Sequence, residues 1–192
     1  MKVIAFNGSA RKDGNTAGLI RSVLKELEAE GISTELEQLA GKQIQGCIAC
    51  YECFKNQDRH CAVKKDMLNE CIDKMLEADG IILGSPTYFA NVSTNIKSLI
   101  DRSGLVAKSN KEMFARKVGA AVVAVRRAGA IHVFNSINHF FFINQMVVPG
   151  SSYWNIGLGL NPGDVEKDDE GIRTMETLGK NMAWVMKRLN SE

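Results

Sequence analysis

The chain has 192 residues, of which 45% are hydrophobic, enough for one well-buried core and too few for two ordinary domains. We therefore expect residues 1–192 to form a single domain. The 24 basic and 22 acidic residues leave a formal charge of +2, which excludes a broad basic face for nucleic acid and a polybasic membrane anchor. The sequence has no apolar run of about 18 residues and no signal-peptide core, and this predicts a cytoplasmic protein. The chain has five cysteines. In that reducing compartment, clustered thiols are expected to hold metal or to do redox work, and oxidation to disulfide pairs is the alternative.

The first part of the chain predicts a strand, a helix and an edge strand. Residues 3–6 form a short apolar run, and the apolar spacing that follows has a helical period. Asn15 is expected to cap this helix with its side-chain oxygen, and Gly31 to end it in a left-handed conformation. Residues 32–39 alternate weakly, as an edge strand does, and lead into a cysteine-rich segment at 41–65.

The rest of the chain alternates helix and strand. Asp66 is expected to cap a helix, and strands are predicted at 80–84, 118–125 and 145–149, each followed by a helix. Such alternation favours a parallel sheet with helices on both faces. The predicted fold class is α/β, a flavodoxin-like three-layer sandwich. Its five-stranded parallel sheet has the order 2-1-3-4-5, with a cysteine-rich insert after strand 2.

Four cysteines lie within this insert in a C-x2-C-x2-C-x7-C pattern. They are Cys47, Cys50, Cys53 and Cys61. Thiolates at the short spacing can reach neighbouring corners of a cubane, and seven intervening residues let the last one fold back. The pattern favours a [4Fe–4S] cluster. A zinc site that uses three or four of these thiolates, with or without His60, and free or redox-active thiols are the alternatives. Cys71 lies on the apolar face of a predicted helix and is expected to be a core thiol.

In a sheet of this order, ligands bind beyond the carboxyl ends of strands 1 and 3. The first loop there, residues 8–16, joins a strand to a helix N-terminus, which attracts phosphate. Its candidate phosphate ligands are Ser9, Arg11, Asn15 and Thr16. The Walker pattern is absent, so a monophosphate such as that of FMN fits better than a nucleoside triphosphate. An ordinary polar turn is the alternative.

Two further loops face the same crevice. Residues 85–92 offer backbone amides and aromatic surface for an isoalloxazine ring, and the candidates are Pro86, Thr87, Tyr88, Phe89 and Asn91. The aromatic residues could instead only pack on a helix. In the third loop, residues 126–130, Arg126 could face the pyrimidine edge of a flavin or a nicotinamide phosphate, or belong to a solvated turn.

Several motifs together resemble the NADPH-dependent FMN reductase family over nearly the whole chain. They are Asn7-Gly8-Ser9-Ala10-Arg11 with Asn15-Thr16, then Gly84-Ser85-Pro86-Thr87-Tyr88-Phe89, then Lys97 and Asp101-Arg102. Within that family, the cysteine run resembles the iron–sulfur flavoproteins, whose compact motif binds a [4Fe–4S] cluster beside FMN. The resemblance implies Ser9, Arg11, Asn15 and Thr16 at the phosphate and Pro86 to Phe89 around the ring. It also implies a homodimer or homotetramer with flavin sites near subunit interfaces.

The sequence thus predicts an FMN-binding redox protein that moves electrons between a reduced donor, ferredoxin or NAD(P)H, and an acceptor. The cofactors carry this chemistry, so no catalytic side chain is expected. A cluster-free NAD(P)H-dependent FMN or quinone reductase is the second hypothesis. A zinc-stabilised nucleotide-binding interaction module without turnover is the third. Three consecutive phenylalanines at 140–142 cannot all point inward from one helix, so part of that surface is expected to pack on another subunit.

Overall fold

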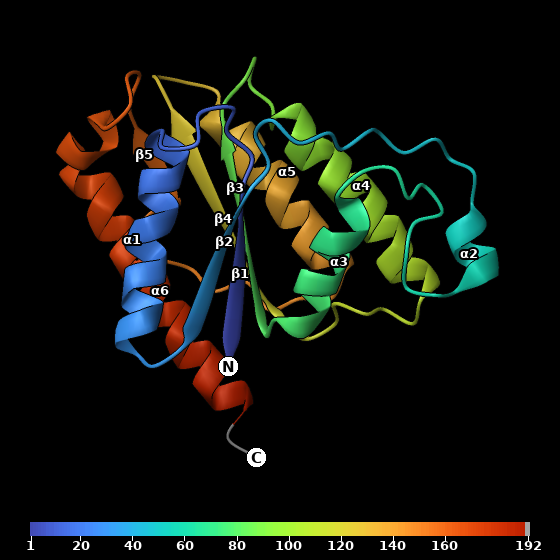
Figure 1. Ribbon diagram of the computed structural model, residues 1–192. Coiled ribbons are helices and arrows are strands. Elements are labelled where there is room, and N and C mark those ends of the chain that lie inside the picture. Colours follow the sequence, from blue (N-terminus) through green and yellow to red (C-terminus); the bar gives the residue numbers. More distant parts are fainter. Residues whose placement is uncertain (191–192) are drawn as a thin grey trace.

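The computed structural model describes residues 1–190, and its centre is a five-stranded parallel sheet in the order β2-β1-β3-β4-β5 (Figure 1). The strands are β1 (Lys2–Asn7), β2 (Ser33–Gln38), β3 (Gly80–Pro86), β4 (Val118–Val125) and β5 (Ile156–Leu158). The helices are α1 (Asn15–Ala29), α2 (Glu52–Asn56), α3 (Leu68–Glu77), α4 (Thr94–Ser109), α5 (Ala130–Ile143), the 3-10 turn η1 (Asp164–Lys167) and α6 (Asp169–Leu189). The predicted fold class and strand order are confirmed.

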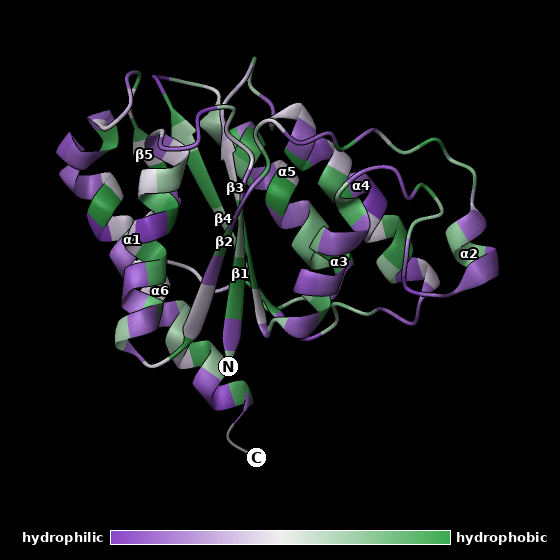
Figure 2. Cartoon of the chain, viewed as in Figure 1, coloured by the Kyte–Doolittle hydropathy of each residue, from purple (hydrophilic) through white to green (hydrophobic). Residues whose placement is uncertain are grey.

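Helices cover both faces of the sheet and make the three layers. Helices α1 and α6 pack on one face, whereas α3, α4 and α5 pack on the other (Figure 1). In Figure 2 the helices carry hydrophobic and hydrophilic residues side by side, as expected of helices with one face buried. Each strand-to-strand connection runs over one face because a parallel pair needs a crossover. The carboxyl ends of all five strands therefore meet at one edge of the sheet.

The strand sequences explain their places in the sheet. Strand β4 reads VGAAVVAV and is buried along its whole length, as a central strand covered on both faces must be. Strand β2 reads STELEQ and is half-buried at the edge. Its Glu35 forms ion pairs with Lys2 and Lys74, at 3.0 and 2.7 Å. Charged side chains of this kind protect an edge strand from pairing with another chain.

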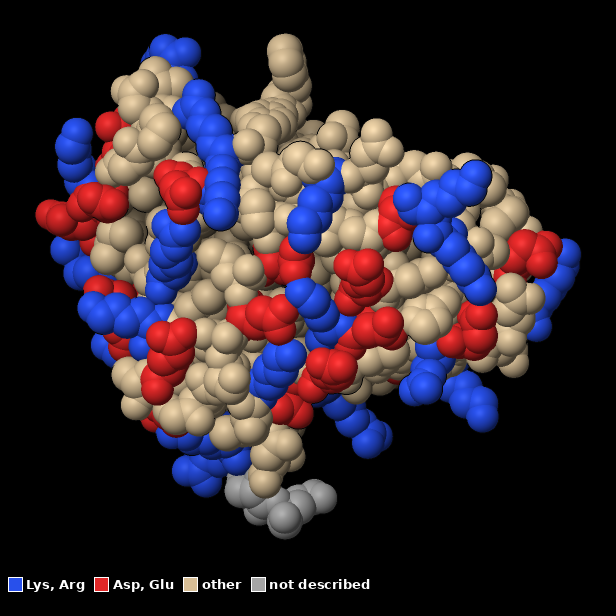
Figure 3. Space-filling model, in the orientation of Figure 1, with Lys and Arg blue, Asp and Glu red and all other residues tan. Residues whose placement is uncertain are grey.

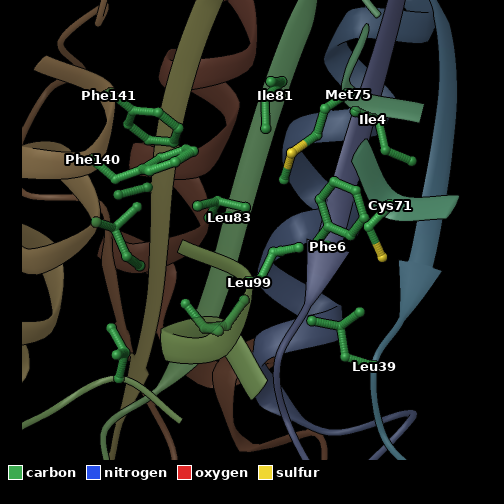
Figure 4. Close-up of a cluster of buried hydrophobic side chains, with 14 of the residues drawn as sticks. Ile4, Phe6, Leu39, Cys71, Met75, Ile81, Leu83, Leu99, Phe140 and Phe141 are labelled. Carbon is green, nitrogen blue, oxygen red and sulfur yellow. The ribbon is translucent and has the colours of Figure 1, made fainter. Parts of the chain in front are cut away.

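The larger hydrophobic core lies between the sheet and α3, α4 and α5. Figure 4 shows strand residues such as Phe6 and Leu83 pointing toward helix residues such as Leu99. Cys71 belongs to this core and has no exposed surface, which confirms that it is a core thiol. Phe140 and Phe141 are buried, but Phe142 is 59% exposed, so the three phenylalanines do not all point inward. That another subunit covers Phe142 stays a prediction.

The position expected for the fifth strand is wrong. Residues 145–149 contribute only an isolated bridge between Val147 and Val118, whereas β5 is Ile156–Leu158, paired with Val123–Val125. The short β5 contains a glycine and lacks a run of β-branched residues, so its sequence gives a weak strand signal. Gly157 is nevertheless required there, because a Cβ at this position would lie 2.5 Å from the side chain of Leu19.

The predicted ends of the first helices are partly confirmed. Gly31 follows α1 with a φ of +79°, as expected. The N-cap of α1 is Gly14, not Asn15, and no side chain caps this end. Asn15 is instead the first residue of the helix, and its Oδ1 accepts from the Val165 N–H at 3.5 Å. The N-cap of α3 is Met67, not Asp66, although Asp66 Oδ1 accepts from the first amide of this helix, that of Leu68, at 3.3 Å.

Charges are distributed over the surface without a single dominant sign on the visible face. In Figure 3, lysine and arginine side chains alternate with aspartate and glutamate across that face. Within residues 1–190, no helix combines the length and the apolar character that a bilayer crossing needs.

We expect Gly119→Ala to destabilise the fold. A Cβ at residue 119 of β4 would lie 2.7 Å from the ring of Phe141, and overpacking of this kind costs about 1–3 kcal/mol. Gly150→Ala is the matched control, because a Cβ there meets nothing within 4 Å. Urea denaturation should show a lower free energy of unfolding for the first variant only, and equal values for both variants would contradict the packing of α5 on β4.

Candidate functional site

A pocket of about 200 Å³ opens at the carboxyl edge of the sheet, and we call it the sheet-edge pocket. Eight of the ten cofactor residues predicted from the sequence line it, and these are Ser9, Arg11, Asn15, Thr16, Pro86, Thr87, Tyr88 and Arg126. The remaining two, Phe89 and Asn91, do not line it. The pocket lies at the end of β1 and β3, where the strand order reverses, as expected for a sheet of this kind.

The first loop of the pocket presents a helix N-terminus. The Gly8 N–H donates to Gly84 O at 2.8 Å, which joins the ends of β1 and β3. The Ser9 N–H donates to Asn7 Oδ1 at 3.0 Å, and Ser9 Oγ accepts from the Arg11 N–H at 3.1 Å. Because no side chain caps α1, its first amides keep their capacity to bind an anion, and the helix dipole adds a partial positive charge.

The second loop contains a polar atom that has no partner. Thr87 Oγ1 is buried and forms no hydrogen bond with any described residue, and Thr87 lines the sheet-edge pocket. Its backbone N–H donates to Ala124 O at 2.9 Å, so β4 holds the residue in place. A buried hydroxyl without a partner is costly, and a polar ligand in this pocket would satisfy it.

The same loop ends in a tight turn with an unusual backbone. Tyr88 and Asn91 exchange two backbone hydrogen bonds of 3.0 Å, and the two residues between them, Phe89 and Ala90, have φ of +47° and +57°. Neither is a glycine, so the turn holds strain. Tyr88 lines the pocket, but Phe89 stands fully exposed at the tip. Contact of Phe89 and Asn91 with a cofactor therefore stays a prediction.

Sequence reasoning missed the segment after β5. Gly159 and Leu160 line the sheet-edge pocket, and Leu160 O accepts from Arg11 Nη1 at 3.0 Å. A Cβ on Gly159 would lie 2.5 Å from the Asn15 side chain, so glycine permits the close approach. The segment was missed because the fifth strand was expected at 145–149 and not at Ile156–Leu158. The available signal was the pair of glycines at 157 and 159 around a short apolar stretch.

A second, separate pocket brings the four clustered cysteines together. Cys47, Cys50, Cys53 and Cys61 all line it, and Ile48, Leu105 and Val106 add apolar walls. We call it the cysteine pocket. The four thiols are free. It shares no lining residue with the sheet-edge pocket, and in Figure 1 the cysteine segment with α2 lies beyond α4, on the side away from α1 and α6.

The backbone of the cysteine segment is strained in four places. Ala49, Tyr51, Gln57 and Arg59 all have a positive φ, between 47° and 64°, although none is a glycine. Tyr51 and Gln57 flank the short helix α2, which contains Cys53. Left-handed backbone costs about 1–2 kcal/mol per residue. Such outliers gather at sites where the structure must aim side chains, and here they lie between the cysteines.

The thiols differ in burial. Cys47 and Cys50 are exposed, whereas burial raises the pKa of the Cys53 thiol. Within residues 1–190, no three His, Cys, Asp or Glu side chains are positioned to hold a metal ion as they stand. His60 does not line the cysteine pocket, and its Nε2 lies 2.8 Å from Asp73 Oδ1.

Comparison with known proteins gives the family to which this chain belongs. Residues 1–161 match the model of the NADPH-dependent FMN reductase family, and the chain belongs to this family of flavin-dependent oxidoreductases. More particularly, it is a redox protein related to the iron–sulfur flavoproteins. An iron–sulfur flavoprotein of Methanocaldococcus jannaschii is 41% identical over 97% of this chain and 98% of the relative. The resemblance stated from the motifs is thereby confirmed.

Solved structures support the fold. RosB with bound 8-demethyl-8-formylriboflavin-5'-phosphate aligns with a TM-score of 0.72 and 17% identity, over 98% of this chain and 80% of that protein. A flavodoxin from the domain Archaea aligns with a TM-score of 0.62 and 19% identity, over 97% and 99%. The flavodoxin-like architecture is thus shared with proteins whose sequences have diverged widely.

Alkylation should separate the clustered thiols from Cys71. In metal-free folded protein, we expect iodoacetamide to modify the exposed Cys47 and Cys50 first. Burial raises the pKa of Cys71 to about 12, above the roughly 8.5 of an unfolded thiol, so this thiol stays protonated and inaccessible up to pH 9. Peptide mass spectrometry checks the order, with urea-unfolded protein as the control in which all five react. Fast labelling of Cys71 in folded protein would refute its placement.

Proposed function

We propose that the protein is an electron-transfer flavoprotein with FMN in the sheet-edge pocket and a [4Fe–4S] cluster in the cysteine pocket. The observation that supports this most is the convergence of four free cysteines, in cluster spacing, on one pocket of a flavodoxin-like chain. FMN couples two-electron to one-electron chemistry, and a cluster carries one electron at a time. The donor is proposed to be ferredoxin or NAD(P)H.

The FMN phosphate would bind at the start of α1. The helix has no side-chain cap, and Ser9, Asn15 and Thr16 add polar groups at the same place. Arg11 lines the pocket as well and supplies a positive charge. RosB, which has the same fold, is described with a bound riboflavin phosphate derivative. A phosphate group therefore suits the charge at this end of the pocket.

The flavin ring would lie toward Pro86, Thr87 and Tyr88. Thr87 Oγ1, which has no partner among the described residues, could accept or donate one hydrogen bond to a polar atom of the ring. Tyr88 offers a flat surface beside it. Arg126 lines the same pocket, and its charge would stabilise negative charge on the ring. These side chains would bind the flavin and adjust its reduction potential, so no residue is assigned a proton-transfer role.

The cluster would take its four ligands from Cys47, Cys50, Cys53 and Cys61. The four cysteines supply the number of thiolates that a cubane needs, and apolar residues line the pocket beside them. The alternative of a zinc site that includes His60 is less well supported, because His60 faces Asp73 and not the cysteine pocket. Four thiolates alone could still hold zinc.

Metal and flavin analysis tests this proposal directly. Protein purified without oxygen should contain about four irons and four sulfides per chain, the content of one [4Fe–4S] cluster, and about one FMN. Cys50→Ala should lose most of the iron and keep the FMN. Cys71→Ala is the matched control and should keep both, since Cys71 lies in the core. FMN without iron would leave the cluster-free reductase, and zinc without flavin would leave the interaction module.

Arg11→Ala should weaken FMN binding, because it removes a charged hydrogen-bond donor from the proposed phosphate site. Removal of a hydrogen bond from a charged group costs about 1.5–3 kcal/mol, which corresponds to about 10- to 100-fold in affinity. Lys12→Ala is the control, because Lys12 is the next residue in the same loop but does not line the pocket. Quenching of flavin fluorescence during titration of apoprotein measures both. Equal losses in Arg11→Ala and Lys12→Ala would contradict a phosphate at this place.

A further inference from the structure

Arg102 is a buried arginine in the wall of the cysteine pocket. It lies on α4, is only 1% exposed, and lines the pocket beside the four cysteines. An arginine is almost never fully buried unless it has partners. Packing alone does not explain it, because a buried ion pair often contributes no more stability than hydrophobic residues of similar volume at both positions would.

The guanidinium of Arg102 joins both ends of the cysteine segment. On the side before Cys47, Arg102 Nη1 donates to Gln45 O at 3.0 Å. On the far side, Arg102 Nη2 donates to Val63 O at 3.1 Å and to Cys61 Sγ at 3.4 Å. One planar group thus ties the residues before the first cysteine to those at and after the last.

Asp66 completes this connection. Its carboxylate forms an ion pair with Arg102 Nη1, and the two side chains are 5% and 1% exposed. Asp66 Oδ2 also accepts from the Gln45 N–H at 3.0 Å, and Oδ1 accepts from the first amide of α3. The pair therefore anchors the segment to α3 as well as to α4. Arginine suits this task because its fork offers several donors in fixed directions.

The contacts of Arg102 and Asp66 hold a segment whose backbone is strained. Its four residues with positive φ favour relaxation to other backbone conformations. Cys61 is held further by a reciprocal pair with Asn69, in which Cys61 N–H donates to Asn69 Oδ1 at 2.8 Å and Asn69 Nδ2 donates to Cys61 O at 3.0 Å. Arg102 is the charged group among the contacts to Cys61.

A hydrogen bond to a ligand sulfur also has an electrostatic effect. Reduction adds one electron to a cluster that already carries four thiolates. A positive charge and an N–H donor at one sulfur stabilise the more negative, reduced form more than the oxidised form, and so raise the reduction potential. Burial strengthens this effect, because the surrounding medium screens charge poorly.

We propose that Arg102 is a positioning residue for the metal centre. Arg102 holds the two ends of the cysteine segment together and, through its hydrogen bond to Cys61 Sγ, raises the reduction potential of the cluster. This inference rests on the proposed cluster in the cysteine pocket. It assigns Asp66 the opposite electrostatic effect, since its carboxylate partly neutralises the guanidinium. A purely structural ion pair would make loss of either partner have the same consequence, so the sign of the two effects distinguishes the roles.

Redox titration of three variants and one control tests the electrostatic part of the proposal. Each sample is equilibrated with a dye of known potential, and one electron passes from reduced dye to oxidised cluster without any change in the bonds of Arg102. Arg102→Gln should shift the equilibrium about tenfold toward the oxidised cluster, which is about 59 mV for one electron. Asp66→Asn should shift it toward the reduced cluster, and Arg102→Lys, which keeps the charge, should restore part of the wild-type value.

The matched control is Arg59→Gln. Arg59 lies in the same segment, two residues before Cys61, but its side chain is exposed and does not line the cysteine pocket. Its charge is therefore screened by solvent, and the shift should be much smaller. A shift in Arg59→Gln equal to that in Arg102→Gln would overturn the specific role of Arg102, as would an unchanged potential in Arg102→Gln.

Two measurements without activity test the closure of the segment. Loss of iron to a chelator should be about 10- to 100-fold faster in Arg102→Gln, as for other residues that orient metal ligands. In metal-free protein, hydrogen exchange of amides at 46–66 should also be faster than in wild type, and equal exchange would contradict closure. If circular dichroism shows that Arg102→Gln does not fold, the potential of Asp66→Asn tests the proposal instead. A shift of that variant toward the oxidised cluster, or no shift, would overturn the proposal.

Failure of the proposed function gives a different result. Wild-type protein without iron in an anaerobic preparation would refute the cluster itself, whatever the variants do. The exchange experiment on metal-free protein would then still report whether Arg102 closes the segment. Full iron in the wild type, with no difference in potential or in chelator sensitivity between the wild type and Arg102→Gln, would refute the role of Arg102 alone.

Discussion

The reversal of strand order between β1 and β3 is the constraint on which the sheet-edge pocket depends. Both strands are parallel and end at the same edge, but the connections that follow them leave over opposite faces of the sheet. Helix α1 covers one face and α4 the other, so no connection fills the space between their starts. The hydrogen bond from the Gly8 N–H to Gly84 O fixes the two strand ends at the floor of this space.

The two pockets are held in place in different ways. The sheet-edge pocket takes its residues from strand ends and from the first turn of a helix, and the hydrogen bonds of the sheet fix them. The cysteine pocket takes its thiols from a long segment with little regular structure, whose shape depends on side chains such as Arg102, Asp66 and Asn69. A pocket of the first kind is formed by the sheet itself, whereas one of the second kind depends on a few polar side-chain contacts.

Strain marks both pockets. Phe89 and Ala90 adopt left-handed backbone in the turn beside the sheet-edge pocket, and Ala49 and Tyr51 do so between the first cysteines. Each such residue costs about 1–2 kcal/mol relative to a relaxed backbone, a noticeable part of the stability of a domain. The rest of the fold tolerates this cost because its central strands are apolar and buried on both faces.

The sequence by itself determined the architecture, because the pattern that decides it is local. The alternation of apolar strands with amphipathic helices specifies a parallel sheet, and the residues at 9–16 and 86–88 follow strands whose ends must meet. The cysteine spacing likewise singles out Cys47, Cys50, Cys53 and Cys61 as candidate ligands without any knowledge of the fold. Such features are read from neighbours in the chain, so no distant contact is needed to predict them.

Only the tertiary structure decided the rest. Strand β5 has three residues and forms because β4 offers a free edge, not because its own sequence favours a strand. Gly159 and Leu160 reach the sheet-edge pocket only through that pairing. The side chain of Asn15 turns toward η1, about 150 residues away, instead of capping its own helix. Arg102 meets the cysteine segment across more than 35 residues of sequence, and no local pattern encodes a contact that exists only once the chain has folded.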